Sequence, residues 1–172
     1  QGHAKPTLTK HIREMVEHLP DSLLGVRDRA LILLGYAGAM RRSELVGLDV
    51  TDLAIAEEGL VVLIRKSKAD QVGVGRKIGI PFGEHPETCP VRAVQAWIEE
   101  GDIDEGPLFR SVNKHGDVSD KRLSDQVVAD VVKRSLRAAG KSAKKYAAHS
   151  LRAGLITQAA IAGVSERAIQ DQ

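Results

Sequence analysis

The chain has 172 residues, of which 42% are hydrophobic and 28% charged, with a formal net charge of +2. These values are typical of one globular domain. No apolar run reaches the roughly 18 residues of a membrane span, and no charged-then-apolar leader opens the chain. We therefore expect neither a membrane-spanning nor a secreted protein. Since aromatic residues make up only 3%, we expect a mainly aliphatic core.

The first predicted elements are helices. Amphipathic spacing predicts a helix over 10–19, with Thr9 as its N-cap, and a more buried helix over 26–37. A short third helix is expected over 42–47. Residues 1–8 are interpreted as a linker or cloning remnant, so that 9–172 form the domain.

The pattern then changes to β-type segments. We expect strands over 53–55, 60–64 and 76–81, with a turn over 57–59 between the first two. Residues 68–75 contain two glycines and are predicted to form the flexible tip of a hairpin. The sequence therefore predicts a small three-stranded antiparallel sheet.

Helices resume in the last part of the chain. They are expected over 90–100, from the Ser124 cap to 139, over 150–162, and after Ser165, while 106–116 is expected to be irregular. The predicted fold class is therefore mainly α with a small three-stranded antiparallel β-sheet (α+β).

The only cysteine, Cys89, precedes Pro90 and belongs to no zinc pattern. We interpret it as structural, in a reducing, cytoplasmic compartment.

Charge is distributed unevenly along the chain. Acidic residues gather in 99–105, and basic residues gather in 65–68, 76–77, 121–122 and 133–145. This distribution indicates either one surface that faces a polyanion or ordinary solvated faces.

Three short segments carry chemistry. The first is Arg41-Arg42-Ser43-Glu44-Leu45, where an apolar helix runs into arginines whose guanidinium forks suit two phosphate oxygens. A surface Arg–Glu pair is the equally weighted alternative, because Arg41 and Glu44 share a helical face.

The second segment, 63–71, brings Lys66 and Lys68 from a strand into the hairpin. A lysine there can bind phosphate or donate a proton, although spacing alone favours an exposed turn. In the third segment, His149 and Arg152 lie three residues apart at a helix start, so both point the same way.

Together and in this order, the three segments resemble the tyrosine recombinase (phage integrase) family, from about Leu8 to Gln172. The family's arginine motif, R-x-S-E-L, corresponds to 41–45, its hairpin lysine to Lys68, and its H-x-L-R box to 149–152. The resemblance implies the tyrosine recombinase catalytic-domain fold. One departure is Ala39-Met40 in place of the commoner Gly-Leu, which we interpret as a mild change of packing.

The resemblance also implies roles. Arg41 and Arg152 would hold the non-bridging oxygens of a scissile DNA phosphate, Lys68 would protonate the 5′-hydroxyl leaving group, and His149 would assist proton transfer. Glu44 would orient the site, and Lys66 remains the alternative to Lys68. No cofactor or metal is implied, because the two guanidiniums supply the positive charge. The residues expected to bind DNA are Arg42, Arg65, Lys66, Arg76 and Lys145.

The family nucleophile is a tyrosine that follows the H-x-L-R box. The chain has only Tyr36 and Tyr146, and neither matches that position. We therefore expect the nucleophile helix to be missing from this chain, and the fragment alone to be inactive. In the full-length protein the resemblance implies an N-terminal core-binding domain, a homotetramer on double-stranded DNA and a nucleoid-associated location.

Three other functions were weighed against a site-specific recombinase. A non-catalytic DNA-binding relative would share every residue of the three motifs. A type IB topoisomerase-like enzyme would use similar chemistry in a longer, more lysine-rich chain. A metal-dependent nuclease is disfavoured, because no carboxylate cluster accompanies the basic residues.

Overall fold

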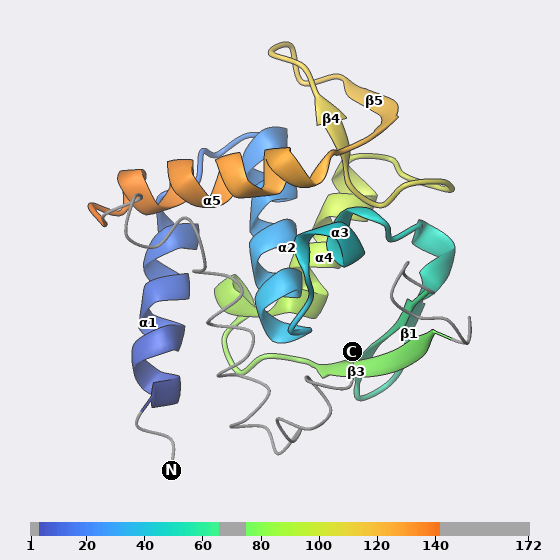
Figure 1. Ribbon diagram of the computed structural model, residues 1–172, viewed down its shortest axis with the longest axis horizontal. Helices are drawn as coiled ribbons and strands as arrows, with labels where there is room; N and C mark the ends of the chain where they lie inside the picture. The colour runs from blue at the N-terminus through green and yellow to red at the C-terminus, as the bar shows by residue number, and fades with distance from the viewer. Residues whose placement is uncertain (1–3, 66–74, 142–172) are drawn as a thin grey trace.

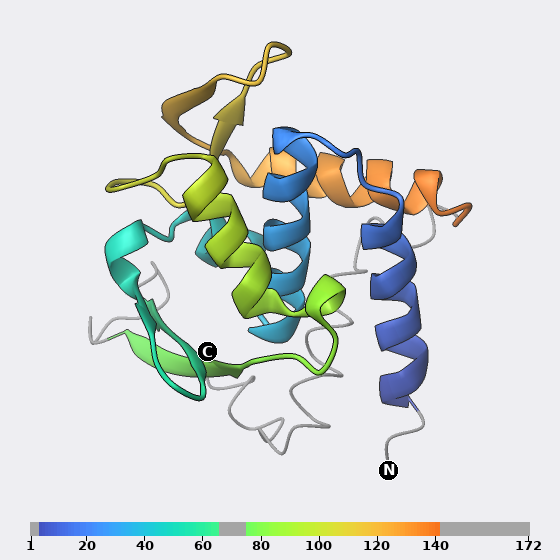
Figure 2. The same cartoon turned by 180° about the vertical axis from the view of Figure 1, so that it is seen from behind.

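The computed structural model describes residues 4–65 and 75–141, with side chains from Lys10 onward. The longest elements of this part of the protein are four helices: α1 (Ala4–Glu17), α2 (Leu23–Ala37), α4 (Pro90–Glu100) and α5 (Asp125–Ala138). Helices α2 and α4 lie side by side in the centre, and α1 and α5 pack beside α2 (Figures 1 and 2).

Helix α2 is central because it is apolar on nearly every side. Every residue from Ala30 to Tyr36 is buried, and the Ser22 side chain caps the helix by accepting from the Gly25 N–H. An all-round apolar helix is stable only when other elements surround it. Helix α4 covers one side through Trp97, whose indole N–H donates to the Leu108 carbonyl at 2.7 Å.

The predicted three-stranded sheet is confirmed. Its strands are β1 (Leu53–Ile55), β2 (Gly59–Ile64) and β3 (Arg76–Pro81), antiparallel in the order β1-β2-β3. Leu60, Val62 and Ile64 alternate toward the core. The sheet lies beyond the C-terminal end of α2, as Figures 1 and 2 show from both sides.

A second, two-stranded sheet was not predicted. Strands β4 (Arg110–Val112) and β5 (Val118–Arg122) form an antiparallel hairpin that projects from the helices (Figure 1). The expectation of an irregular 106–116 was therefore wrong at 110–112, while the residues on either side of β4 in that range are irregular. Both strands are short and mostly polar, and their tip is held by the Asn113 side chain. That side chain accepts from the N–H groups of His115 and Asp117.

The first helix also differs from its predicted start. It begins at Ala4, within the residues interpreted as a linker, and Thr9 lies inside it rather than at its N-cap. Helix α5, in contrast, has the predicted Ser124 cap and is followed by Gly140 with a φ of +75°. The helices expected over 150–162 and after Ser165 lie outside the described residues.

Two further expectations concern the core and the membrane. Cys89 is structural as expected: it is fully buried, and its Sγ accepts from the N–H groups of Gly83 at 3.1 Å and Arg92 at 3.5 Å. Among the helices of the described residues, none has the length and apolar character to span a bilayer. The fold class is confirmed as mainly α with a small antiparallel three-stranded sheet.

Candidate active site

The first candidate motif lies at the junction between α2 and the short helix α3 (Arg42–Val46). The chain turns sharply after Gly38 because Ala39 adopts a left-handed conformation with a φ of 51°. Glycine reaches that conformation without strain and alanine does not. Met40 is buried, at 2% exposure. The departure at Ala39 is therefore one of backbone conformation rather than of packing.

Arg41 stands at the N-cap position of α3. Its backbone N–H donates to Oε1 of Glu44 at 2.9 Å, which fixes the first turn. The side chains of Arg41 and Arg42 are exposed. Neither guanidinium has a hydrogen bond or ion pair with another residue in the described part of the chain. Among the described residues, Arg41 therefore presents an unpaired positive charge on an anchored backbone.

Glu44 does not form the surface pair that was considered for Arg41. Its carboxylate is 6% exposed and pairs with Arg76, at 3.1 Å from Nη1 to Oε2. The same carboxylate accepts the Arg41 N–H. Glu44 therefore joins the start of α3 to the start of β3.

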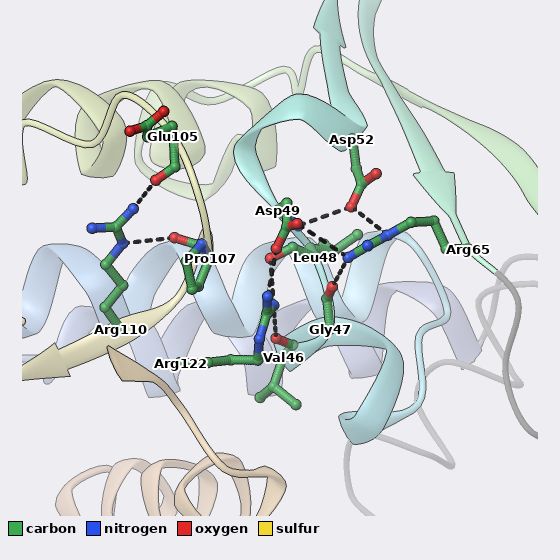
Figure 3. A network of polar contacts seen from close by, with 10 residues as sticks. All are labelled: Val46, Gly47, Leu48, Asp49, Asp52, Arg65, Glu105, Pro107, Arg110 and Arg122. Atoms are coloured by element: carbon green, nitrogen blue, oxygen red, sulfur yellow. Dashed lines mark hydrogen bonds and ion pairs between the residues drawn. The ribbon is translucent and has the colours of Figure 1, made fainter. Parts of the chain in front are cut away.

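Arg65, the last described residue before 66–74, lies at the opposite end of α3 (Figure 3). Its Nε pairs with Oδ2 of Asp52 at 3.0 Å, and its Nη2 lies 3.5 Å from Asp49 and donates to the Gly47 carbonyl. Arg76 pairs with Ile64 in the sheet, one residue from Arg65. The two arginines thus connect the base of the β2–β3 hairpin to both ends of α3.

The structure brings together five of the predicted site residues: Arg41, Arg42, Glu44, Arg65 and Arg76. The other five lie outside the described residues: Lys66, Lys68, Lys145, His149 and Arg152. Of the two tyrosines, Tyr36 is buried in α2 at 8% exposure, and Tyr146 also lies outside the described residues. Within the described ranges, no cluster of three or more His, Cys, Asp or Glu side chains could hold a metal ion.

Three residues of this region were not predicted from the sequence: Asp49, Asp52 and Arg122. Arg122 comes from β5, 73 residues after Asp49 along the chain, and pairs with it at 2.6 Å. No local spacing indicates a partner that far away. The local sequence signal for this group is the pair of acidic residues, Asp49 and Asp52, shortly after the arginine motif.

Comparison with known proteins gives one family. The model of the phage integrase family matches residues 7–172. An integrase/recombinase xerD homolog of Selenomonas ruminantium is 42% identical over 140 residues, which cover 81% of this chain and 41% of that protein. Tyrosine recombinase XerC of Thermodesulfovibrio yellowstonii is 30% identical over 146 residues, covering 84% of this chain and 45% of that protein.

Solved structures agree on the fold. The XerH site-specific recombinase bound to palindromic difH substrate, in a post-cleavage complex, matches with a TM-score of 0.63 and 22% identity, over 88% of this chain and 40% of that one. Its pre-cleavage complex on difH matches with a TM-score of 0.62 and 24% identity. The chain thus spans less than half the length of these relatives.

Proposed function

The chain belongs to the phage integrase family, and we propose that it is the catalytic domain of a site-specific DNA recombinase that breaks and rejoins strands through a 3′-phosphotyrosyl intermediate. The observation that carries this proposal is the state of Arg41. Its guanidinium is exposed and unpaired among the described residues, while its backbone is fixed by the Glu44 carboxylate. An unpaired guanidinium on a fixed junction suits a phosphate ligand.

The two motif arginines stabilise the negative charge on the phosphate. Arg41 and Arg152 bind the two non-bridging oxygens of the scissile phosphate, where negative charge increases as the attacking oxygen adds to phosphorus. Guanidinium forks held in place before the reaction stabilise that charge without reorganisation. Because two guanidiniums supply the positive charge at the phosphate, the proposed mechanism requires no metal ion.

Proton transfer falls to Lys68 and His149. A tyrosine oxygen attacks phosphorus, the P–O5′ bond breaks, and Lys68 donates a proton to the departing 5′-oxygen. His149 assists by accepting the tyrosine proton. Lys66 is the alternative proton donor, since it lies two residues before Lys68 in the same segment. Rejoining reverses the steps: the 5′-hydroxyl attacks the phosphotyrosine, so the bond energy is conserved.

Binding to double-stranded DNA draws on the positive residues around these motifs. Arg42, Lys66 and Lys145 contact the phosphate backbone, and Arg65 and Arg76 add positive charge at the hairpin base. The guanidiniums of Arg65 and Arg76 also bind carboxylates within the protein. The complete protein is proposed to assemble as a homotetramer on DNA.

The nucleophile is proposed to lie outside residues 1–172. Tyr36 is buried beneath the junction, and Tyr146 precedes rather than follows the H-x-L-R box. Residues 1–172 then supply the phosphate site without the attacking oxygen. The domain alone is expected to hold a DNA phosphate without cutting it.

The test uses the complete reading frame and nicked DNA substrates, in which the strand beyond the nick diffuses away after cleavage and traps the covalent adduct. The wild-type protein should form an adduct that survives denaturation. Arg41→Ala and Arg152→Ala should abolish it while retaining DNA binding. Arg13→Ala, at an exposed site on α1 away from the junction, is the matched control and should form the adduct as the wild type does.

Two results would contradict the proposal. An adduct that persists at wild-type yield in Arg41→Ala would remove that residue from the site. Salt-dependent DNA binding without any adduct, across substrates cut by related recombinases, would instead identify a non-catalytic DNA-binding relative.

A further inference from the structure

We propose that Asp49 is a positioning residue for Arg41: it holds the C-terminal end of helix α3 through two arginines, and so sets where the Arg41 guanidinium meets the scissile phosphate. This inference rests on the proposed function. It concerns a group of contacts that we call the Asp49 network, made of Asp49, Asp52, Arg65, Arg122 and the carbonyls of Val46, Gly47 and Leu48.

Helix α3 cannot set its own orientation. It has five residues, and a helix that short is unstable without tertiary contacts. Its first turn is fixed by the Glu44 carboxylate, on which both the Arg41 N–H and Arg76 converge. The helix also packs against α5 and α2 through the buried Leu45 and Val46, but its polar contacts at the first turn fix the N-terminal end alone. The direction of the Arg41 side chain therefore also depends on the polar contacts that hold the other end.

The other end is held by guanidinium groups (Figure 3). Arg122 Nη1 donates to the carbonyls of Val46 at 2.9 Å and Leu48 at 3.2 Å, and Arg65 Nη2 donates to the carbonyl of Gly47. The last carbonyls of a helix lack partners within the helix, and cations are favoured at that end. Arg122 of β5 and Arg65, which follows β2, thus donate to three consecutive carbonyls, of which that of Leu48 also accepts the Leu108 N–H at 2.9 Å.

Asp49 is the group that both guanidiniums share. Its Oδ1 lies 2.6 Å from Arg122 Nη2, and its Oδ2 lies 3.5 Å from Arg65 Nη2. Its backbone N–H donates to Asp52 Oδ2 at 2.8 Å, and Asp52 also binds Arg65. Without the Asp49 charge, the two positive side chains would repel each other at the helix end. Asp49 therefore keeps Arg65 and Arg122 together on α3.

The exposure of these groups indicates a geometric rather than a stabilising role. The side chains of Asp49, Arg122 and Arg65 are 25%, 38% and 49% exposed. Ion pairs this open to solvent contribute little to folding. A displacement of about 1 Å at a reacting group can, however, lower a rate by about 100-fold. Loss of Asp49 should thus affect cleavage far more than folding.

A chemically modified DNA substrate can distinguish variants that misplace Arg41 from variants that are impaired in folding or in DNA affinity. In a methylphosphonate, a methyl group replaces one charged non-bridging oxygen of the scissile phosphate, so there is less negative charge for Arg41 to stabilise. A variant whose defect comes from a missing or misplaced Arg41 should recover on this substrate. A variant whose defect comes from folding or DNA affinity should be equally impaired on both substrates.

The experiment measures adduct formation by the complete protein on nicked DNA with either a phosphate or a methylphosphonate at the cleavage position. The stereoisomer used is the one that Arg41→Ala cuts better. Asp49→Asn should lose up to about 100-fold in rate on the phosphate and several-fold less on the methylphosphonate, with unchanged DNA affinity. Asp120→Asn is the matched control: it removes a fully exposed carboxylate from an Asp–Arg pair on the β4–β5 hairpin, where Arg110 keeps its bonds to the Glu105 and Pro107 carbonyls, and it should match the wild type on both substrates.

Three results would overturn the proposal. Asp49→Asn could cut the phosphate at the wild-type rate, or lose equally on both substrates while Arg41→Ala recovers; each removes the positioning role and leaves the proposed function intact. If Arg41→Ala itself does not recover, the role of Arg41 in the proposed function fails as well. Should Asp49→Asn not fold, Arg122→Lys replaces it, because lysine keeps the charge but cannot bind both carbonyls and the carboxylate.

Discussion

In the part of the chain that the structure describes, two aspartates each bridge a pair of arginines, but they do so in different surroundings. Asp28, on α2, binds Arg27 at 2.9 Å and Arg134 of α5 at 2.8 Å, and its side chain is fully buried. Asp49 binds Arg122 and Arg65 at the end of α3, where all three side chains are partly exposed. The same chemical arrangement thus occurs once in the core and once beside the candidate site.

The core arrangement holds three parts of the fold together. Arg27, which is 4% exposed, makes two hydrogen bonds to Asp28 and donates a third to the Arg110 carbonyl at the start of β4. Arg134 adds α5 to the same carboxylate. We call these residues, with that carbonyl, the Asp28 network.

The difference between the two networks separates stability from geometry. A buried charge that loses its partner is left uncompensated in a poorly polarisable interior, so the Asp28 network should determine whether the domain folds. Breaking the Asp49 network should lower the free energy of unfolding only slightly, because water can replace the lost ionic partner of each exposed side chain. Its position at the end of α3 makes it relevant to the chemistry instead.

The largest effect is expected for Asp28→Asn. The substitution preserves the shape of the side chain but leaves Arg27 buried without an anion, which should lower the free energy of unfolding by about 3–5 kcal/mol. Urea denaturation followed by circular dichroism measures it. Asp120→Asn, which alters a fully exposed carboxylate paired with Arg110, should change the same quantity by less than about 0.5 kcal/mol, because Arg110 keeps its bonds to the Glu105 and Pro107 carbonyls. Equal effects in the two variants would show that burial does not distinguish these pairs.

A smaller effect of opposite sign is expected at the start of α3. Ala39→Gly should raise the free energy of unfolding by about 1 kcal/mol, because it relieves a left-handed conformation that costs alanine roughly 1–2 kcal/mol, less the entropy that glycine loses on folding. Ala37→Gly, at the end of α2, should lower it by about 0.5–1 kcal/mol. If Ala39→Gly is destabilising, the turn before Arg41 is not strained as its φ indicates.

Asp49→Asn should lower the free energy of unfolding by no more than about 1 kcal/mol. Chemical denaturation alongside Asp28→Asn measures the contrast directly. A loss as large as that of Asp28→Asn would make the Asp49 network a second stabilising element, and the comparison between the two networks would fail.

The smallest effect depends on pH. The Lys141 ammonium lies 2.7 Å from the Glu14 carboxylate, and its hydrogen bond is the main cause that holds the pKa of that carboxyl below its ordinary value. Desolvation opposes this shift, and the positive charge of Lys141 adds to it by less. A lowered pKa in the folded state means that the contribution is complete above the ordinary value of 4.5 and is lost as the pH falls through the lowered value.

Glu14→Gln removes this contribution. The unfolding midpoint of the wild type should therefore exceed that of the variant near neutral pH, and the two should converge as the pH is lowered below the ordinary glutamate value. Glu17→Gln, on the exposed side of the same helix, should leave the midpoint unchanged. A difference between wild type and Glu14→Gln that persists in acid would exclude the ion pair as its cause.

Much of the fold could be predicted from sequence because its signals are local. Strand β3 and helix α4 have the predicted bounds, since alternation in the one and a leading Pro90 in the other mark their ends. The β4–β5 hairpin escaped prediction because Ser119, Asp120 and Lys121 give no apolar alternation. The pairing of β4 with β5 is determined by the Asn113 tip of the hairpin and by tertiary contacts.

In the candidate site, too, local motifs were predicted from the sequence and contacts between distant residues were not. Arg41 and Glu44 were identified from one contiguous motif, and the structure places them at one junction. Their partners were not foreseen, because Arg76 follows Glu44 by 32 residues and Arg122 follows Asp49 by 73. Their positive charge predicted DNA binding for Arg65 and Arg76, but it did not predict that they pair with carboxylates within the protein. Which carboxylate each arginine meets is decided by the packing of the sheet against α3, which no short pattern contains.

The central claim is that residues 1–172 supply the phosphate site and that the attacking oxygen lies elsewhere in the protein. The most direct test digests the covalent adduct of the complete protein with protease and identifies, by mass spectrometry, the residue bonded to the DNA. The account predicts a single tyrosine beyond Gln172. A nucleotide attached to Tyr36, to Tyr146 or to a residue that is not tyrosine would contradict it.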